Sequence, residues 1–169
     1  MKAPEPLLLG IDVGTYQSKG VLVAPSGGIA CEAVVDHRLE VPRPGWAEHD
    51  SEATWWKDFV EICRALEASC PGSLARVAAV GCSAIAPAVV PVDAAGRPLR
   101  KAILYGIDTR ASREVDYLHS TLGEEVVLRR CYTLLSSQSA GPKILWIARN
   151  EPRVFERAAR FLTASSYLV

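Results

Sequence analysis

The spacing of apolar residues along the chain predicts a layered α/β domain. Three apolar runs separated by short turns predict consecutive strands at residues 7–13, 17–24 and 29–41. From Trp55 to Leu66 the apolar residues recur every three or four positions, as in an amphipathic helix that ends near residue 71. Shorter runs predict strands and then helices in the rest of the chain: strands at 76–83, 88–92 and 101–105, and helices at 113–122, 124–130, 139–149 and 151–160. The order of these elements favours a mixed sheet.

The boundaries between these elements carry turn and capping signals. Gly14-Thr15-Tyr16 is too short for a helix, so the first two strands are expected to form an antiparallel hairpin. The stretch 42–45 contains two prolines and a glycine, which predicts a loop. Asp50-Ser51-Glu52 is typical of a helix N-terminus. Glu48 and His49 directly precede that helix, and we expect both side chains to face solvent.

Composition and charge exclude several classes of protein. The 169 residues include 19 Lys and Arg against 19 Asp and Glu, so the formal net charge is zero and neither nucleic acid nor an anionic membrane is an expected partner. The longest apolar runs fall well short of the roughly 20 residues of a membrane helix. The five cysteines are scattered and the start has no secretory-signal pattern, which indicates a reducing, cytoplasmic protein without a zinc site.

The last residues differ from an ordinary domain end. Residues 164–169 are largely apolar, and no polar tail follows them. We therefore expect the chain to stop inside an element, with the domain incomplete at its C-terminus. Such a domain would expose an apolar face, which predicts self-association into homo-oligomers or aggregates.

The first predicted hairpin could bind a magnesium-bound phosphate. It matches neither the phosphate loop Gly-x-x-x-x-Gly-Lys-Ser/Thr nor the dinucleotide fingerprint. It does place Asp12, which offers hard oxygen to Mg²⁺, at the end of a strand. The backbone at Gly14 and Thr15 could approach a phosphate, and Lys19 could add a positive charge. A plain hairpin with aspartate and glycine in turn positions is the alternative.

Four segments, in order along the chain, resemble the FGGY carbohydrate kinases. Gly10-Ile11-Asp12-Val13-Gly14-Thr15 and the following residues to Lys19 resemble the family's opening. Residues 44–50 with Trp55-Trp56 resemble its Pro-Gly-Trp-x-Glu-x-Asp segment and Trp-Trp helix. Residues 103–110 resemble the block that ends Asp-x-Arg, and residues 143–152 resemble its Lys-Leu-Leu-Trp and Asn-Glu-Pro stretch. The four segments together span nearly the whole chain.

This resemblance implies a fold, a reaction and a set of cofactors. The fold would be a ribonuclease H-like, actin-like ATPase domain, and the reaction would be transfer of the γ-phosphoryl group of ATP to a hydroxyl of a sugar or polyol, as in xylulokinase-like members. ATP and Mg²⁺ would contact Asp12, Gly14, Thr15 and Lys19, with Asp12 facing the metal. Residues 1–169 would form a truncated N-terminal domain without the second, ATP-binding domain. The family's catalytic aspartate would lie beyond Val169, so we expect the chain alone to be inactive.

The sugar-binding residues are less well defined by the resemblance. It implies contacts from Ser83 and Ala84, although Ala84-Ile85-Ala86-Pro87 stands where xylulokinase-like members carry a polar cluster. An apolar replacement cannot recognise hydroxyls by hydrogen bonding, so the sequence leaves the particular sugar open. Asp108 and Arg110 could contact the sugar or form a buried ion pair that orders the following helix.

Two other functions are compatible with parts of the sequence. The chain could be a non-catalytic sugar- or nucleotide-binding relic that kept Asp12, Gly14 and Thr15. It could also be another actin-like phosphotransferase, such as an acetate-kinase or chaperone-type ATPase. The segment 45–48 and Trp55-Trp56 argue against that second alternative. His37 and His119 are interpreted as surface or hydrogen-bonded structural histidines.

Overall fold

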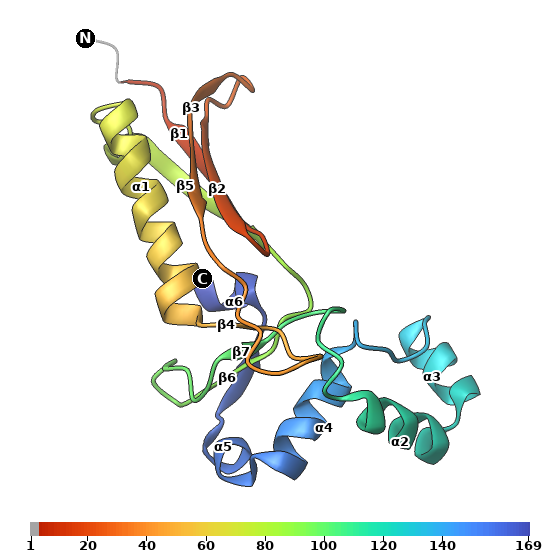
Figure 1. Ribbon diagram of the computed structural model, residues 1–169. Helices are drawn as coiled ribbons and strands as arrows, with labels where there is room; N and C mark the ends of the chain where they lie inside the picture. Colours follow the sequence, from red (N-terminus) through yellow and green to blue (C-terminus); the bar gives the residue numbers. More distant parts are fainter. Residues whose placement is uncertain (1–3) are drawn as a thin grey trace. The chain divides into compact units, whose positions relative to one another are not determined.

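The computed structural model describes residues 4–169, which form two compact units (Figure 1). The first unit contains the chain up to Leu39 together with Glu52–Ile85 and Ser165–Val169. The second unit contains Glu40–Ser51 and Ala86–Ala164. The chain therefore leaves the first unit twice and returns to it twice.

A four-stranded mixed sheet with the strand order β3-β2-β1-β5 forms the first unit. β1 (Leu7–Val13), β2 (Gln17–Val23) and β3 (Ile29–Asp36) are antiparallel neighbours, and β5 (Val77–Ala84) runs parallel to β1. The predicted mixed sheet with three antiparallel opening strands is confirmed.

The third strand is shorter than the sequence predicts. β3 ends at Asp36, which pairs with Gln17 at the beginning of β2. Beyond this pair β2 offers no further residues to a ladder, and only the His37 N–H still donates to the Tyr16 carbonyl, at 2.9 Å. The apolar alternation continues to Val41, but residues beyond Asp36 have no neighbouring strand to pair with, so β3 ends there.

The helix α1 (Lys57–Ser69) covers one face of this sheet and packs against β2 and β3 (Figure 1). Side chains alternate along β1, so that Ile11 and Val13 are buried while Leu8 and Asp12 are exposed on the opposite face. A π-helical segment, Ser51–Trp56, precedes α1, and a 3₁₀ turn, Leu74–Arg76, follows it. The open face carries the exposed apolar side chains of Leu8 and Val34. Self-association through such a face stays a prediction.

The last residues of the chain belong to the first unit. The helix α6 (Ala164–Leu168) brings Tyr167 against Trp55, with the ring centroids 5.9 Å apart in an edge-on arrangement. Trp55 is fully buried. The core of this unit thus includes side chains more than 100 positions apart in sequence.

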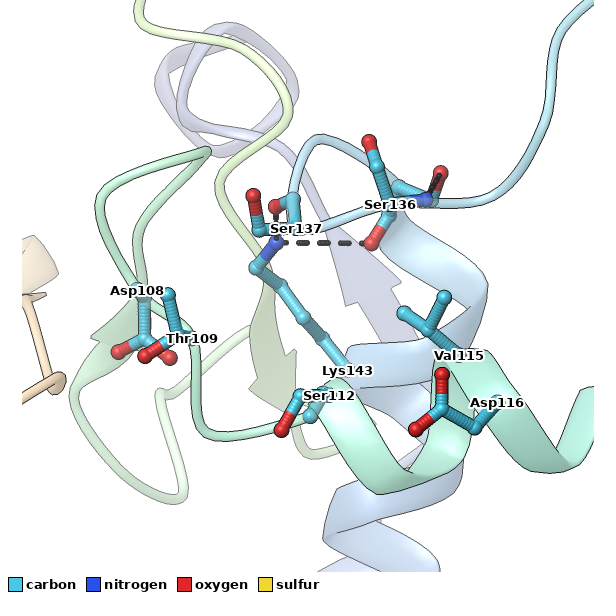
Figure 2. A pocket seen from close by; sticks show the side chains of 10 residues that line it. Asp108, Thr109, Ser112, Val115, Asp116, Ser136, Ser137 and Lys143 are labelled. Atoms are coloured by element: carbon cyan, nitrogen blue, oxygen red, sulfur yellow. Dashed lines mark hydrogen bonds between the residues drawn. The ribbon is translucent and has the colours of Figure 1, made fainter.

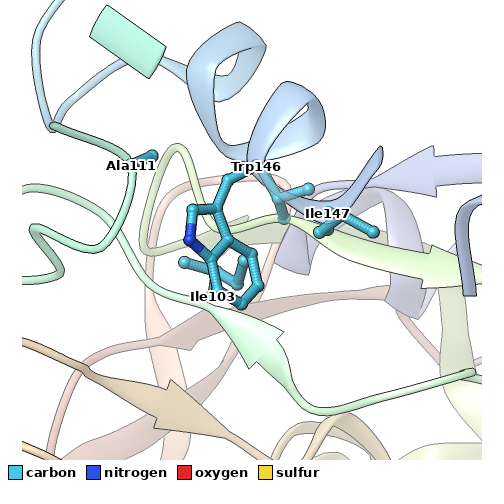
Figure 3. Close-up of a cluster of buried hydrophobic side chains, with 5 residues drawn as sticks. Ile103, Ala111, Trp146 and Ile147 are labelled. Atoms are coloured by element: carbon cyan, nitrogen blue, oxygen red, sulfur yellow. The ribbon is translucent and has the colours of Figure 1, made fainter. Parts of the chain in front are cut away.

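Two short antiparallel strand pairs and four helices make up most of the second unit. β4 (Glu48–His49) pairs with β7 (Ala102–Ile103), and β6 (Val90–Val92) pairs with β8 (Arg160–Leu162). The helices are α2 (Ser112–Leu122), α3 (Glu124–Cys131), α4 (Ala140–Asn150) and α5 (Pro152–Arg157). Trp146 and Ile147 of α4 pack on Ile103 and Ala111 to form its core (Figure 3).

Two predictions for the second unit are wrong. The helix predicted for residues 151–160 ends at Arg157, and the chain then extends into β8, because the buried strand β6 provides a pairing edge. Glu48 and His49 are buried instead of facing solvent. Their strand is covered because Glu48 meets cationic partners more than 50 positions away in sequence. No helix among residues 4–169 has the length and apolar character that crossing a membrane requires.

Candidate functional site

Three of the predicted site residues lie in one row across the open face of the sheet. Asp12 on β1 is directly opposite Lys19 on β2 and Ser83 on β5. Directly paired residues on neighbouring strands place their side chains on the same face, and all three residues are exposed. They line an open groove of about 650 Å³ together with Gly10 and Gly81. The strand register thus places a carboxylate between an ammonium group and a hydroxyl.

The turn that follows Asp12 is held tightly by Gly14. The Gly14 N–H donates to the Gln17 carbonyl at 2.9 Å, and a Cβ on Gly14 would lie 2.7 Å from that carbonyl oxygen. A side chain at this position would therefore force the hairpin apart. Gly14 and Thr15 lie at the turn and are not among the residues that line the groove. The Gly14 N–H is already bonded within the hairpin. The role of Gly14 is therefore to let the two strands approach closely at the turn.

Ala84, the last residue of β5, also lies outside the groove lining. It pairs with Val13, and the next residue, Ile85, donates its N–H to the Val13 carbonyl at 2.8 Å. Ala84 therefore extends the parallel ladder to the end of β1. Its methyl group offers no hydrogen bond to a ligand.

Asp108 and Arg110, in the second unit, form a buried ion pair with each other. The Arg110 Nη2 donates to Asp108 Oδ2 at 2.7 Å, and neither side chain is exposed to solvent. The Asp108 carboxylate also accepts the N–H of Ala47 at 2.7 Å and that of Arg110 at 3.1 Å. These bonds tie the loop before β4 to the segment that leads into α2. Of the two roles that the sequence leaves open, the buried pair is present, and sugar contact stays a prediction.

Glu48 extends this ion pair into a larger network. One oxygen of Glu48 accepts from Arg110 at 2.7 Å and from Arg100 at 2.5 Å. The Arg110 guanidinium lies 3.8 Å from the ring centroid of Trp46, within range of a cation–π interaction. Burial lowers the pKa of Arg100, and the charges of Glu151 and Glu48 oppose this effect. The network gives each buried charge an opposite partner, which burial of a charge requires.

A second pocket, of about 150 Å³, surrounds Lys143 (Figure 2). The pocket lies between the N-terminal part of α2, the 136–139 loop and α4. The Lys143 ammonium group donates to the Ser137 carbonyl and lies 3.5 Å from the Ser139 carbonyl. Asp108 and Asp116 contribute carboxylates to the lining. Lys143 was not among the predicted site residues, although its place on the same helical stripe as Trp146 and Ile147 marks a lysine on a buried face.

Burial lowers the pKa of Lys143 to about 8, and the Asp108 charge opposes this shift while Arg110 adds to it. Between pH 8 and 10.5 the Lys143 side chain then binds more protons in the unfolded chain than in the folded one. The free energy of unfolding that Lys143 contributes therefore rises with pH over this range. Relative to Lys143→Met, the free energy of unfolding of the wild type should increase by about 1–2 kcal/mol from pH 7.5 to 10, after allowance for solvent screening. Urea unfolding at both pH values measures this difference.

Lys57→Met is the matched control, because the Lys57 side chain is 62% exposed. Its stability difference from the wild type gives the effect of removing an exposed lysine at each pH value. Parallel pH profiles for the wild type and Lys143→Met would contradict the lowered pKa of Lys143.

Comparison of the fold with solved structures shows that the chain resembles a class of kinases. It superposes on xylulose kinase from Rhodospirillum rubrum with a TM-score of 0.89 and 30% identity, over 96% of this chain and 33% of that one. Glycerol kinase from Plasmodium falciparum, determined with ADP, shares the fold with a TM-score of 0.82 and 20% identity, over 97% and 33%. These kinases have the ribonuclease H-like, actin-like ATPase fold, so the predicted fold class is confirmed.

The sequence places the chain more narrowly. Residues 7–169 match the family described as FGGY family of carbohydrate kinases, N-terminal domain. Glycerol kinase from Beutenbergia cavernae is 34% identical over 155 residues, which are 90% of this chain and 30% of that protein. The chain belongs to the FGGY family of carbohydrate kinases, as its four sequence segments predict. It spans about a third of the length of the relatives that it matches.

Proposed function

We propose that this chain provides the magnesium- and phosphate-binding side of an ATP-dependent kinase that phosphorylates a hydroxyl of a sugar or polyol, as xylulokinase-like members do. The observation that carries the proposal is the row of Asp12, Lys19 and Ser83 on an open groove. Membership of a carbohydrate kinase family supports the reaction class. The determination of Plasmodium falciparum glycerol kinase with ADP supports an adenine nucleotide as cofactor.

The residues around Asp12 fit a magnesium ion bound to a nucleotide. Among residues 4–169 no three His, Cys, Asp or Glu side chains lie close enough to form a metal cage. Mg²⁺ is often held by one or two carboxylates while phosphates and waters fill its other positions, and the exposed Asp12 carboxylate suits that role. When bound, ATP would supply the phosphoryl group, and Mg²⁺ would neutralise negative charge on the phosphate oxygens.

The neighbours of Asp12 would orient the reactants. The Lys19 ammonium group would compensate the charge of the phosphates across the groove. The Ser83 hydroxyl can both donate and accept a hydrogen bond, so it would contact a hydroxyl of the sugar. For Ala84, Asp108 and Arg110, the same sugar-binding role is a prediction that rests on the sequence resemblance.

Asp12→Asn tests the metal-binding role with little change of shape. We expect the wild-type chain to bind MgATP, and we expect Asp12→Asn to bind it at least about tenfold more weakly, because an amide is a poor ligand for Mg²⁺. Calorimetry with ATP plus Mg²⁺, and with ATP plus a chelator, measures the effect. Asp36→Asn is the control, since Asp36 is exposed in the same unit but does not line the groove.

Equal affinities for Asp12→Asn and the wild type, or binding that is unchanged by the chelator, would overturn the metal-binding role.

We also propose that the 169-residue chain alone does not catalyse transfer, because it spans about a third of the length of its relatives and, by the resemblance, lacks the family's catalytic aspartate. An assay with ATP and a panel of pentoses and polyols should stay at background. Turnover clearly above background would contradict this second statement while leaving the first intact.

A further inference from the structure

His37 joins three elements of the first unit beneath the turn at Gly14. It follows β3 directly, and its side chain is only 7% exposed. Its Nδ1 lies 2.7 Å from Oδ2 of Asp58, in the first turn of α1. Its Nε2 lies 3.2 Å from the carbonyl oxygen of Gly14. The Ser18 hydroxyl on β2 donates to the same Asp58 oxygen at 2.7 Å, so the carboxylate is held from two sides.

The partners of the imidazole determine what each ring nitrogen does. A backbone carbonyl can only accept a hydrogen bond, so Nε2 must carry a proton when it bonds to Gly14. The other ring nitrogen, Nδ1, faces the Asp58 carboxylate, and this contact holds the ring in the orientation that points Nε2 at Gly14.

The bond to Gly14 fixes more than one carbonyl. In a trans peptide the C=O and the following N–H point in opposite directions, so a fixed Gly14 carbonyl also fixes the direction of the Thr15 N–H. The His37 backbone N–H donates to the Tyr16 carbonyl at 2.9 Å. One residue thus holds the carbonyls on both sides of Thr15. Because Asp58 lies on the buried face and Asp12 on the exposed one, His37 supports the turn from the face opposite the groove.

We propose that His37 is a positioning residue for the phosphate-binding turn, and that it acts through the hydrogen bond from Nε2 to the Gly14 carbonyl. The expected effect of His37 on nucleotide binding rests on the proposed function. The turn must keep one shape for Asp12 and the backbone at Thr15 to meet the same phosphate group. A bond from the buried side supplies that constraint without occupying the groove.

Two substitutions separate the two bonds of the ring. The side-chain nitrogen of glutamine reaches the position of Nε2, so His37→Gln keeps a donor for Gly14 and loses the one for Asp58. The side-chain nitrogen of asparagine reaches the position of Nδ1, so His37→Asn keeps the donor for Asp58 and loses the one for Gly14. Ser18→Ala is the control, because it removes a buried bond to Asp58 and leaves Gly14 untouched.

The test uses nuclear magnetic resonance and calorimetry on the 169-residue chain. In the wild type Nε2 of His37 should show the ¹⁵N shift of a protonated nitrogen. The Thr15 amide signal should move in His37→Asn and stay in place in His37→Gln and Ser18→Ala. MgATP should bind about tenfold more weakly to His37→Asn, and about as well to His37→Gln as to the wild type.

An unprotonated Nε2 in the wild type would overturn the proposal without any variant, even if His37→Asn does not fold. Equal effects of His37→Gln and His37→Asn on the Thr15 amide would also overturn it, since the role would then not pass through Gly14. If the wild type does not bind MgATP, the proposed function fails, and the Thr15 amide still decides whether His37 positions the turn.

Discussion

Arg110→Met should lower the free energy of unfolding by about 3–5 kcal/mol, the usual cost of removing one partner from a buried ion pair. The substitution leaves the carboxylates of Asp108 and Glu48 buried without their shared cation. It also removes the guanidinium that lies 3.8 Å from the Trp46 ring centroid. Methionine has a similar length, so lost volume is a minor part of the effect. Urea unfolding followed by tryptophan fluorescence measures the change.

Arg97→Met is the control for this experiment. Arg97 pairs with Asp93 at 2.8 Å, but its side chain is 76% exposed, and exposed pairs contribute little. We expect its unfolding curve to overlay that of the wild type closely. If Arg110→Met unfolds at the same urea concentration as Arg97→Met, the buried network does not stabilise the second unit.

Gly20→Ala should destabilise the chain by about 1–3 kcal/mol, because the helix α1 crosses β2 directly over this glycine. A Cβ at Gly20 would lie 2.2 Å from Cγ2 of Ile62 and 3.2 Å from Cδ1 of Ile11. Ile62 is fully buried, and its branched side chain has little rotamer freedom in a helix. The helix or the strand must therefore move to admit one methyl group. Thermal or urea unfolding detects the loss.

Gly81→Ala is the matched control on the same sheet. Gly81 lies in β5 on the open face, and a Cβ there meets no atom within 4 Å. Alanine is expected to be neutral or slightly stabilising at this position, because it restricts the unfolded chain. A loss of stability in Gly81→Ala equal to that in Gly20→Ala would show that close helix packing is not the cause.

The sequence predicts those parts of the fold that local patterns determine. The β1–β2–β3 meander follows from alternating apolar residues and strong turns, and α1 follows from its three-and-four spacing. β8 is missed because a three-residue strand carries almost no periodic signal and forms only against β6. The burial of Glu48 is missed for a similar reason, since Arg100 and Arg110 become its neighbours only after folding.

The candidate site is likewise predictable only where local sequence determines it. Asp12 and Lys19 are identified from the residues of the first hairpin and from the family resemblance. Their direct pairing across the two strands, and the addition of Ser83, 71 positions after Asp12, depend on the strand register. The support of the turn by His37 is invisible in the sequence, because Asp58 and Gly14 are neighbours of the ring only in space.

The contact between Trp55 and Tyr167 has a consequence for synthesis of the protein. A ribosome finishes all four strands of the sheet and α1 by Ala84, yet it must then make the whole 86–164 segment before Tyr167 exists. During that interval the nascent chain holds all four strands of the sheet and α1, while Trp55 has not yet met Tyr167. Closing so long a loop is slow relative to forming a hairpin, so final consolidation of the first unit waits until Tyr167 has been made.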